Sequence, residues 1–202
     1  MRDPGITLHP ILTMDEGHSV NAVFFDGVRV PRENLIGQLN QGWTYAKDLL
    51  ARERANNAQA PRTKRDIIEL DRLAHTLVDA GGRALIEQGW VKRRLAVLTA
   101  DFVALESAAL AVIAEQMKGH EPGPAASTLK IRGSELQQRV SETAMALLGE
   151  AGIVLSPDYG AGLLAPEGRG WAERHFFRRV VTIYAGANEI QKSIIAKAIL
   201  DM

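Results

Sequence analysis

Hydrophobic positions change their spacing near residue 40, and this change divides the chain into two parts. Before it, apolar residues alternate with polar ones over 6–12 and recur over 20–30, where Asp26 and Gly27 interrupt them. Alternation with a period of two is typical of β-strands, and an Asp-Gly pair between apolar residues favours a tight hairpin turn. Pro31 then ends pairing because it has no N–H to donate. The first part is therefore predicted to be a short arm of two or three strands.

After residue 40, apolar residues recur every three or four positions, as they do on one face of a helix. This spacing predicts helices over 41–55, from 64 to about 77, over 86–117, over 124–148 and over 188–200. Gly149 fits the position that follows a helix C-terminus, and residues 149–170 are rich in Gly and Pro, which predicts a loop. The predicted fold class is mainly α, an antiparallel four-helix bundle with a short N-terminal β arm.

The apolar faces of the three long helices are predicted to form the core. These faces carry Ile67, Leu70, Ala74 and Leu77, then Leu95, Leu98, Phe102, Leu105, Ala109 and Val112, and then Leu129, Leu136, Val140, Ala144 and Leu147. Four aromatic residues have two interpretations, either burial in this core or anchoring of an interface. They are Trp90, Trp171, Phe176 and Phe177.

Composition excludes several classes of function. The chain has 202 residues, 46% of them hydrophobic, and a formal net charge of zero, so nothing indicates disorder, nucleic-acid binding or attraction to an anionic membrane. The absence of cysteine excludes disulfides and thiolate chemistry, and the five histidines show no metal-ligand spacing. No apolar run approaches the roughly 20 residues that a membrane span needs, and no signal peptide is recognisable. We expect a soluble, cytoplasmic protein with no metal and no membrane span.

The candidate chemistry lies near the C-terminus, in the segment 183–191, which reads IYAGANEIQ. A short loop centred on Gly186 leads into an amphipathic run that contains Ile190, Ile194 and Ile195. This pattern predicts a tight turn that delivers the N-terminus of the last helix. Such an N-terminus carries unpaired backbone N–H groups and the positive end of the helix dipole. The segment therefore suits an anionic or polar group of a cofactor.

The same segment resembles the C-terminal part of acyl-CoA dehydrogenases. Further stretches resemble that family in the same order: PGIT at 4–7, FFDGVRVP at 24–31, GW at 42–43 with RER at 52–54, and LLGEAG at 147–152. The resemblance implies that residues 1–36 are the end of a middle β domain and that residues 37–202 are a C-terminal helical-bundle domain. It implies the C-terminal half of a longer protein, for which a truncated product, a mis-assigned start codon and a broken gene all stay open.

The resemblance implies FAD-dependent α,β-desaturation of acyl-CoA thioesters, in which a carboxylate removes the α-proton. In the family the residue after Tyr184 is commonly the catalytic Glu, but this chain has Ala185. In some branches the base lies on the first bundle helix, in a pair like Glu53-Arg54, so the resemblance implies Glu53 as the base and Arg54 as the residue that places it. The other interpretation of Arg52, Glu53 and Arg54 is an ordinary solvated helix face.

For FAD, the resemblance implies a set of cofactor-binding positions: Gly149, Gly152, Gly186, Ala187, Asn188, Glu189 and Gln191. The two glycines of 149–152 would approach the FAD of a neighbouring subunit, although Gly149 also fits a plain helix end. The backbone of 186–188 would meet the FAD held with this subunit. Glu189 and Gln191 would reach the adenine or ribityl groups, or are simply residues of a helix start.

The resemblance also implies partners, namely an acyl-CoA substrate, electron-transfer flavoprotein as electron acceptor, and other dehydrogenase subunits in a homo- or hetero-oligomer. Active members usually carry an R-x-x-F-G signature, which the region 83–94 lacks. Because the signature is missing and positions 185 and 187 are both Ala, a second function stays open. The chain would then be a non-catalytic partner subunit or remnant that supports a hetero-oligomeric dehydrogenase.

A basic cluster precedes the C-terminal loop and consists of Arg174, Arg178 and Arg179. Guanidinium groups bind both phosphates and carboxylates. The cluster therefore has three interpretations: neutralisation of the phosphates of FAD or CoA, a bridge to a partner subunit, or structural ion pairs within the bundle.

Overall fold

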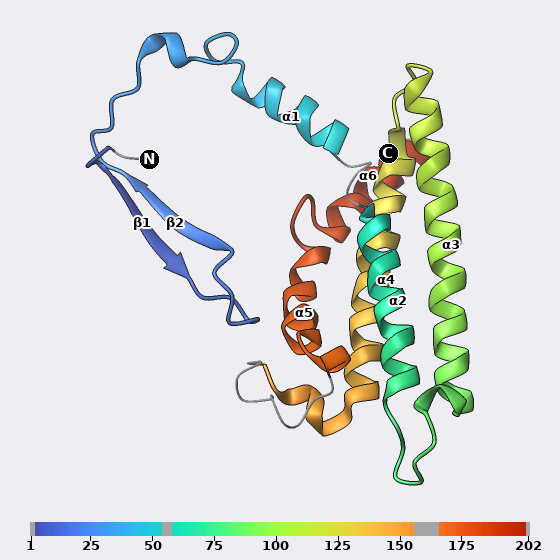
Figure 1. Cartoon of the computed structure of the whole chain (residues 1–202). Helices are drawn as coiled ribbons and strands as arrows, with labels where there is room; N and C mark the ends of the chain where they lie inside the picture. The colour runs from blue at the N-terminus through green and yellow to red at the C-terminus, as the bar shows by residue number, and fades with distance from the viewer. Residues whose placement is uncertain (1–2, 54–57, 156–165, 201–202) are drawn as a thin grey trace.

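The computed structural model describes residues 3–53, 58–155 and 166–200, with the backbone alone described for 50–53 (Figure 1). The strands are β1 (Ile6–Ile11) and β2 (Val20–Phe25). The α-helices are α1 (Gly42–Glu53), α2 (Ala60–Thr76), α3 (Gly89–Met117), α4 (Gly123–Leu148), α5 (Trp171–Phe177) and α6 (Asn188–Leu200). Short 3-10 helices are η1 (Arg32–Asn34), η3 (Leu85–Glu87), η4 (Gly149–Ile153), η5 (Pro166–Gly168) and η6 (Arg178–Thr182).

The two strands form an antiparallel hairpin that pairs Ile6 with Phe25 and Ile11 with Val20. The connection between them is the segment 12–19, whereas Asp26 and Gly27 follow the second strand. Gly27 does adopt a left-handed turn with φ +61°, but residues 28–30 form no strand. The prediction that Asp26-Gly27 joins two paired strands is therefore wrong. The N–H of Asp26 donates to the Gly5 carbonyl at 2.8 Å, which closes the hairpin at this end and leaves the next residues without a partner strand.

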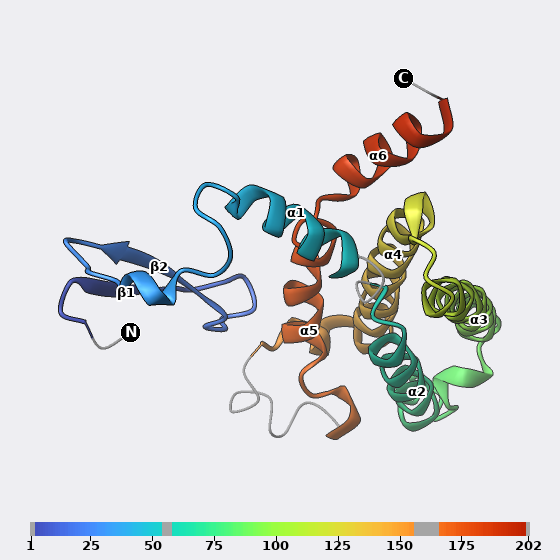
Figure 2. The same cartoon turned by 90° about the horizontal axis from the view of Figure 1, so that it is seen from above.

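Helices α2 and α4 run in the same direction and α3 runs in the opposite one, and α5 with η6 forms a fourth column against α4 (Figures 1 and 2). The predicted class, mainly α with a four-helix bundle and a β arm, is confirmed. The helix of the fourth column, α5, was not among the helices predicted from the sequence, because its seven residues are too few to show a helical period. Helix α1 lies outside the bundle, with Trp43 exposed, and α6 packs on α4.

The core lies between the long helices and matches the predicted apolar faces. Ile67, Leu70 and Ala74 of α2 are buried, as are Leu95, Leu98, Phe102 and Leu105 of α3 and Leu129, Leu136, Val140, Ala144 and Leu147 of α4. Leu77, Ala109 and Val112 pack against this core as half-buried residues. Trp171 is 1% exposed, so its burial interpretation is confirmed. Trp90 is exposed.

Gly133 of α4 allows the chain before α2 to approach closely. A Cβ at this position would lie 2.5 Å from the carbonyl oxygen of Ala58 and 2.8 Å from its Cα. At these distances the Cβ would overlap the Ala58 atoms, so any side chain at position 133 would displace the Ala58 backbone. The glycine therefore fixes where Gln59 and the start of α2 lie relative to α4.

The expectation that no segment is apolar enough to span a membrane does not hold for helix α3. Within Gly89–Met117 one stretch is long and apolar enough to cross a membrane by length and composition, and 28% of that stretch is buried in the structure. The core helix of a water-soluble protein meets the same criterion. The exposed apolar residues of α3 include Val97, Val103, Leu110 and Ile113.

Candidate functional site

The C-terminal loop is a reversal of the chain between η6 and α6. The N–H groups of Ile183 and Tyr184 donate to the Val180 carbonyl at 2.8 and 3.0 Å. Two successive residues then adopt left-handed conformations, Ala185 with φ +54° and Gly186 with φ +92°. A non-glycine residue in this region is strained by about 1–2 kcal/mol. The turn therefore needs other contacts to hold it, and the buried side chains of α4 and α6 supply them.

Asn188, the first residue of α6, is 4% exposed and is the main contact of the turn with α4. Its Oδ1 accepts a hydrogen bond from Lys130 Nζ at 2.8 Å. Its Nδ2 donates to Ser134 Oγ at 3.1 Å, and that hydroxyl donates to the Ile131 carbonyl at 2.9 Å. Both polar ends of the amide are thus satisfied inside the protein. The side chain of Asn188 therefore holds the turn against α4, while Gly186, two positions earlier, is exposed.

Gln191 holds the turn from the other side. It is 2% exposed, and its Nε2 lies 3.4 Å from the carbonyl oxygen of Gly186, to which it donates. A Cβ at Gly186 would lie 2.3 Å from the same Nε2, so a side chain there would displace the Gln191 amide, and the positive φ of +92° itself favours glycine. Glu189, in contrast, is exposed in the first turn of α6. Among the predicted cofactor residues 187, 188, 189 and 191, Glu189 is the exposed one, and Ala187 is half-buried.

The other predicted cofactor segment lies at the opposite end of α4. Gly149 caps that helix with φ +56°, which agrees with the predicted helix end, and Gly152 is buried in η4 against Leu148 and Met145. Lys130, beside the turn, and Gly149 are 19 positions apart, or about 28 Å at about 1.5 Å of rise per residue. Within one chain, Gly149 and Gly152 therefore cannot meet the same part of a ligand as Gly186.

The predicted base lies at the edge of the described residues. Glu53 is the last residue of α1, and its backbone alone is described. Arg54 lies outside the described residues. The pairing of Glu53 with Arg54 therefore stays a prediction.

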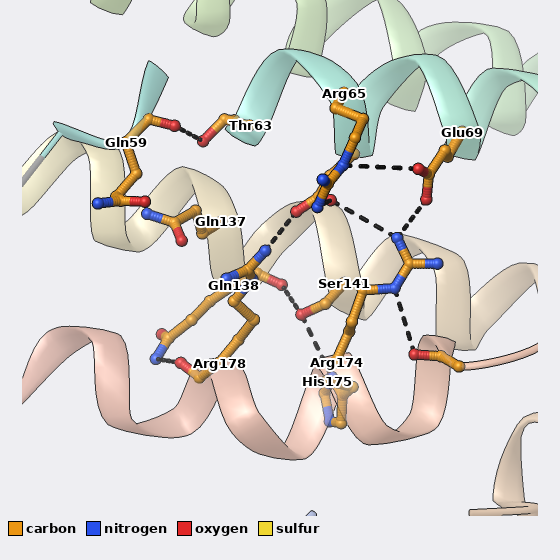
Figure 3. Close-up of polar contacts among 12 residues, drawn as sticks. Gln59, Thr63, Arg65, Glu69, Gln137, Gln138, Ser141, Arg174, His175 and Arg178 are labelled. Carbon is orange, nitrogen blue, oxygen red and sulfur yellow. Dashed lines mark hydrogen bonds and ion pairs between the residues drawn. The ribbon is translucent and has the colours of Figure 1, made fainter. Parts of the chain in front are cut away.

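Two arginines of the cluster, Arg174 and Arg178, form ion pairs with α2 (Figure 3). Arg178 Nη2 donates to Asp66 Oδ2 at 2.5 Å, and both side chains are almost fully buried, at 2% and 4% exposure. Arg174 Nη1 lies 3.5 Å from Asp66 Oδ1 and also donates to Glu69. Arg179 Nη1 lies 3.0 Å from Glu142 Oε1 on α4. The structural interpretation of the cluster is confirmed, because each guanidinium has a carboxylate partner within the bundle.

Burial also changes the ionisation of two groups on the same helices. Burial lowers the pKa of Arg178, and the carboxylate of Asp66 opposes this by favouring the charged form. Burial, followed by repulsion from Arg179, lowers the pKa of His175, and Glu142 opposes this effect. His175 Nδ1 lies 3.5 Å from Ser141 Oγ, a distance too long for a strong hydrogen bond. We therefore assign no catalytic role to this Ser–His pair.

Sequence reasoning missed the buried polar residues of α4 near the loop, of which Lys130 and Ser134 hold Asn188. Lys130, Ser134 and Gln137 are 1%, 1% and 2% exposed. Their spacing of four and then three positions places them on one helix face, together with the apolar residues of the core. This spacing was the available signal, but polar residues on a helix are usually solvated, so spacing alone did not identify them. Among the described residues, no group of three or more acidic or histidine side chains could hold a metal ion.

Comparison with known proteins identifies what this arrangement resembles. Residues 40–200 match the family described as acyl-CoA dehydrogenase, C-terminal domain. The acyl-CoA dehydrogenase FadE26 of Mycobacterium tuberculosis is 30% identical over 202 residues, which cover 98% of this chain and 49% of that protein. The ChsE4-ChsE5 complex of Mycobacterium tuberculosis is 29% identical with a TM-score of 0.81, covering 98% of this chain and 50% of the matched one. The Tcur3481-Tcur3483 steroid ACAD is 28% identical with a TM-score of 0.82, covering 98% and 49%. The chain spans about half the length of these relatives.

Replacing Asp66 by Asn tests the ion-pair assignment of the arginine cluster. The Asp66→Asn variant removes the buried negative charge that Arg178 and Arg174 share, so a buried guanidinium loses its counter-charge. We expect the free energy of unfolding to fall by about 3–5 kcal/mol. Urea denaturation followed by circular dichroism measures the change.

Asp71→Asn is the matched control on the same helix, because the Asp71 side chain is 54% exposed. We expect this variant to change the free energy of unfolding by no more than about 0.5 kcal/mol. Equal effects of the two substitutions would contradict the assignment of Asp66 as a stabilising counter-ion.

Proposed function

Because the chain belongs to the acyl-CoA dehydrogenase family and matches its C-terminal domain, we propose that it supplies the helical-bundle part of an FAD-dependent acyl-CoA dehydrogenase. The proposed reaction is desaturation of an acyl-CoA thioester between its α and β carbons. The observation that carries the proposal is the match over residues 40–200, which includes the turn at Ala185–Gly186 and α6. Members of this family are flavoproteins, and FAD would accept the hydride from the β carbon.

The exposed turn fits a polar cofactor group. Gly186 is exposed, and the 13-residue helix α6 begins two positions later, so its first N–H groups are directed toward the loop. We propose that the backbone of Gly186, Ala187 and Asn188 contacts FAD. The side chains of Asn188 and Gln191 would contribute indirectly, by holding that backbone in place. Glu189 remains a proposed direct contact.

We propose that Gly149 and Gly152 contact a different FAD molecule, held by a neighbouring subunit. The separation of about 28 Å along α4 supports this division, because one cofactor moiety cannot touch both ends of the helix. The proposed enzyme is therefore an oligomer in which each chain contributes to two cofactor sites. An acyl-CoA substrate, electron-transfer flavoprotein as electron acceptor and a cytoplasmic location complete the proposal, on the basis of the family resemblance.

The proposed domain boundary lies between residues 36 and 37. In support of it, β1 pairs with β2, and the matched family region begins at residue 40. The segment 1–36 would then be the end of a β domain and the segment 37–202 the helical domain.

A second candidate function is that of a non-catalytic subunit in a hetero-oligomeric dehydrogenase. The observation that favours it is Ala185, because a methyl group cannot accept a proton at a position where the family commonly has Glu. One similar structure is a complex of two named components, ChsE4 and ChsE5, which supports a two-component assembly. Flavin binding and turnover distinguish the two candidates.

Titration of the purified chain with FAD tests the cofactor proposal. We expect saturable quenching of flavin fluorescence. We also expect the Gly186→Ala variant to bind FAD about tenfold more weakly or worse, because an L-residue is strained by about 1–2 kcal/mol in this conformation. Gly82→Ala is the matched control, since Gly82 also has a positive φ, of +76°, and nothing lies within 4 Å of a Cβ built there. Absence of FAD binding by the full-length protein would overturn the cofactor proposal and favour the non-catalytic candidate.

Replacement of Glu53 tests the identity of the base. In the full-length enzyme, we expect Glu53→Gln to lower kcat for acyl-CoA oxidation by about 10²–10⁴-fold, the usual contribution of a general base, while FAD stays bound. Glu87→Gln is the control, because Glu87 is an exposed carboxylate of η3. Turnover that survives in Glu53→Gln would exclude this residue as the base.

A further inference from the structure

Lys130 is a buried cation that lacks a carboxylate partner among the described residues. Lys130 is 1% exposed, and its Nζ donates a hydrogen bond to Asn188 Oδ1 at 2.8 Å. An ammonium group has three N–H donors, so two remain to be satisfied. Within the described part of the chain, no Asp or Glu oxygen lies within the 4.0 Å that defines an ion pair with Nζ. Lysines are almost never fully buried unless they are paired, so this one needs a further partner.

A small pocket of about 100 Å³ lies directly beside Lys130. Its lining consists of Gln59, Lys130, Gln137, Val181, Tyr184 and Ala185. Gln59 and Gln137 lie next to each other where the start of α2 crosses α4 (Figure 3). Gln137 is 2% exposed, and its Oε1 has no hydrogen-bond partner among the residues that the structure describes. The pocket therefore lies between a buried ammonium group that makes one hydrogen bond and a buried amide oxygen that makes none among the described residues.

The pocket borders the exposed turn, which gives it an entrance. Tyr184 and Ala185 line it from the loop side and are both exposed. Val181 of η6 forms an apolar wall and is 2% exposed. A space of 100 Å³ corresponds to about three water molecules at roughly 30 Å³ each. A space of this size suits a small ion or one small polar group.

The charge of Lys130 selects the kind of occupant. Burial lowers the pKa of Lys130, and Glu189, exposed at the start of α6, opposes this from a distance. A carboxylate in contact with Nζ would offset the cost of burial, because it accepts charge-assisted hydrogen bonds from the two unused N–H donors. A water beside it would donate to Gln137 Oε1. Water alone satisfies the hydrogen bonds but supplies no counter-charge.

We propose that this pocket is a binding site for a small carboxylate, with Lys130 as its counter-ion. The site is distinct from the proposed cofactor backbone of 186–188, and it does not depend on FAD or on the proposed reaction. Ala185 keeps the pocket open because its side chain is a methyl group.

Titration of the protein with sodium formate at constant ionic strength tests the proposal. The signal is the NMR resonance of Lys130 Cε in protein labelled at lysine. We expect a saturable shift of this resonance and none at Lys192, an exposed lysine of α6. Formamide, the neutral analogue of formate, should cause no shift. Affinity should fall as pH is raised through the pKa of Lys130, because the uncharged amine no longer attracts the anion.

Two pairs of variants define the site. Lys130→Met should weaken formate binding by about tenfold or more, the usual effect of losing a hydrogen bond to a charged group, whereas Lys192→Met should leave it unchanged. Asp and Asn both tolerate left-handed φ, so Ala185→Asp and Ala185→Asn are matched in backbone strain. The Ala185→Asp variant should place a carboxylate beside Lys130, whereas the Ala185→Asn side chain is uncharged. The pKa of Lys130 should therefore be higher in Ala185→Asp than in Ala185→Asn.

The length of the acid distinguishes two sources of the carboxylate. Binding of formate and acetate without butyrate would identify a closed site for a small ion. Binding of butyrate as well would identify the carboxylate end of a longer ligand that enters past Tyr184, and either result supports the site. The proposal is overturned if formate causes no saturable shift in folded protein, if formamide acts like formate, or if Lys130→Met binds formate as tightly as the wild type.

Discussion

The structure depends on one constraint: helix α4 lies at the centre of the bundle and carries polar side chains that must find partners without water. Burying a polar group without a hydrogen bond costs a few kcal/mol, so each such side chain fixes the element that satisfies it. Lys130 and Ser134 fix the start of α6 through Asn188. Gln138 donates to the Arg178 carbonyl at 3.0 Å and so fixes η6. The C-terminal loop between η6 and α6 is therefore positioned by α4 from both sides.

The same constraint explains why the loop can be exposed and still have a defined shape. Its strained residue, Ala185, lies between two anchored elements, so the energy of the left-handed turn is offset by buried contacts on both sides. Gly186 is then exposed and Ala187 half-buried, while Asn188 and Gln191 are buried. A cofactor would meet a surface that is already arranged, which lowers the entropic cost of binding. The ion pairs of Asp66 with Arg174 and Arg178 hold α2 to the fourth column in the same way.

Much of the fold could be predicted from the sequence, and the candidate site only in outline. The period of Leu129, Leu136 and Val140 identified α4 and its buried face, because a long apolar repeat has few alternative structures. Helix α5 has too few residues to show a period, and the Asp26-Gly27 turn has no strand after it to join. The turn before α6 was visible from Gly186, whereas the role of Lys130 was not, because a lysine in a helix usually faces solvent. Contacts between residues far apart in the chain, such as Lys130 with Asn188, are set by packing and leave no local pattern.

The central claim is that the contact of Asn188 with α4 fixes the C-terminal turn. Amide hydrogen exchange in the wild type and in Asn188→Ala tests this claim most directly, because exchange measures the local opening of individual segments. Faster exchange in Asn188→Ala confined to residues 184–191, with α2 and α3 unchanged, is the predicted result. Unchanged exchange in that segment, or acceleration spread evenly over the whole bundle, would contradict it.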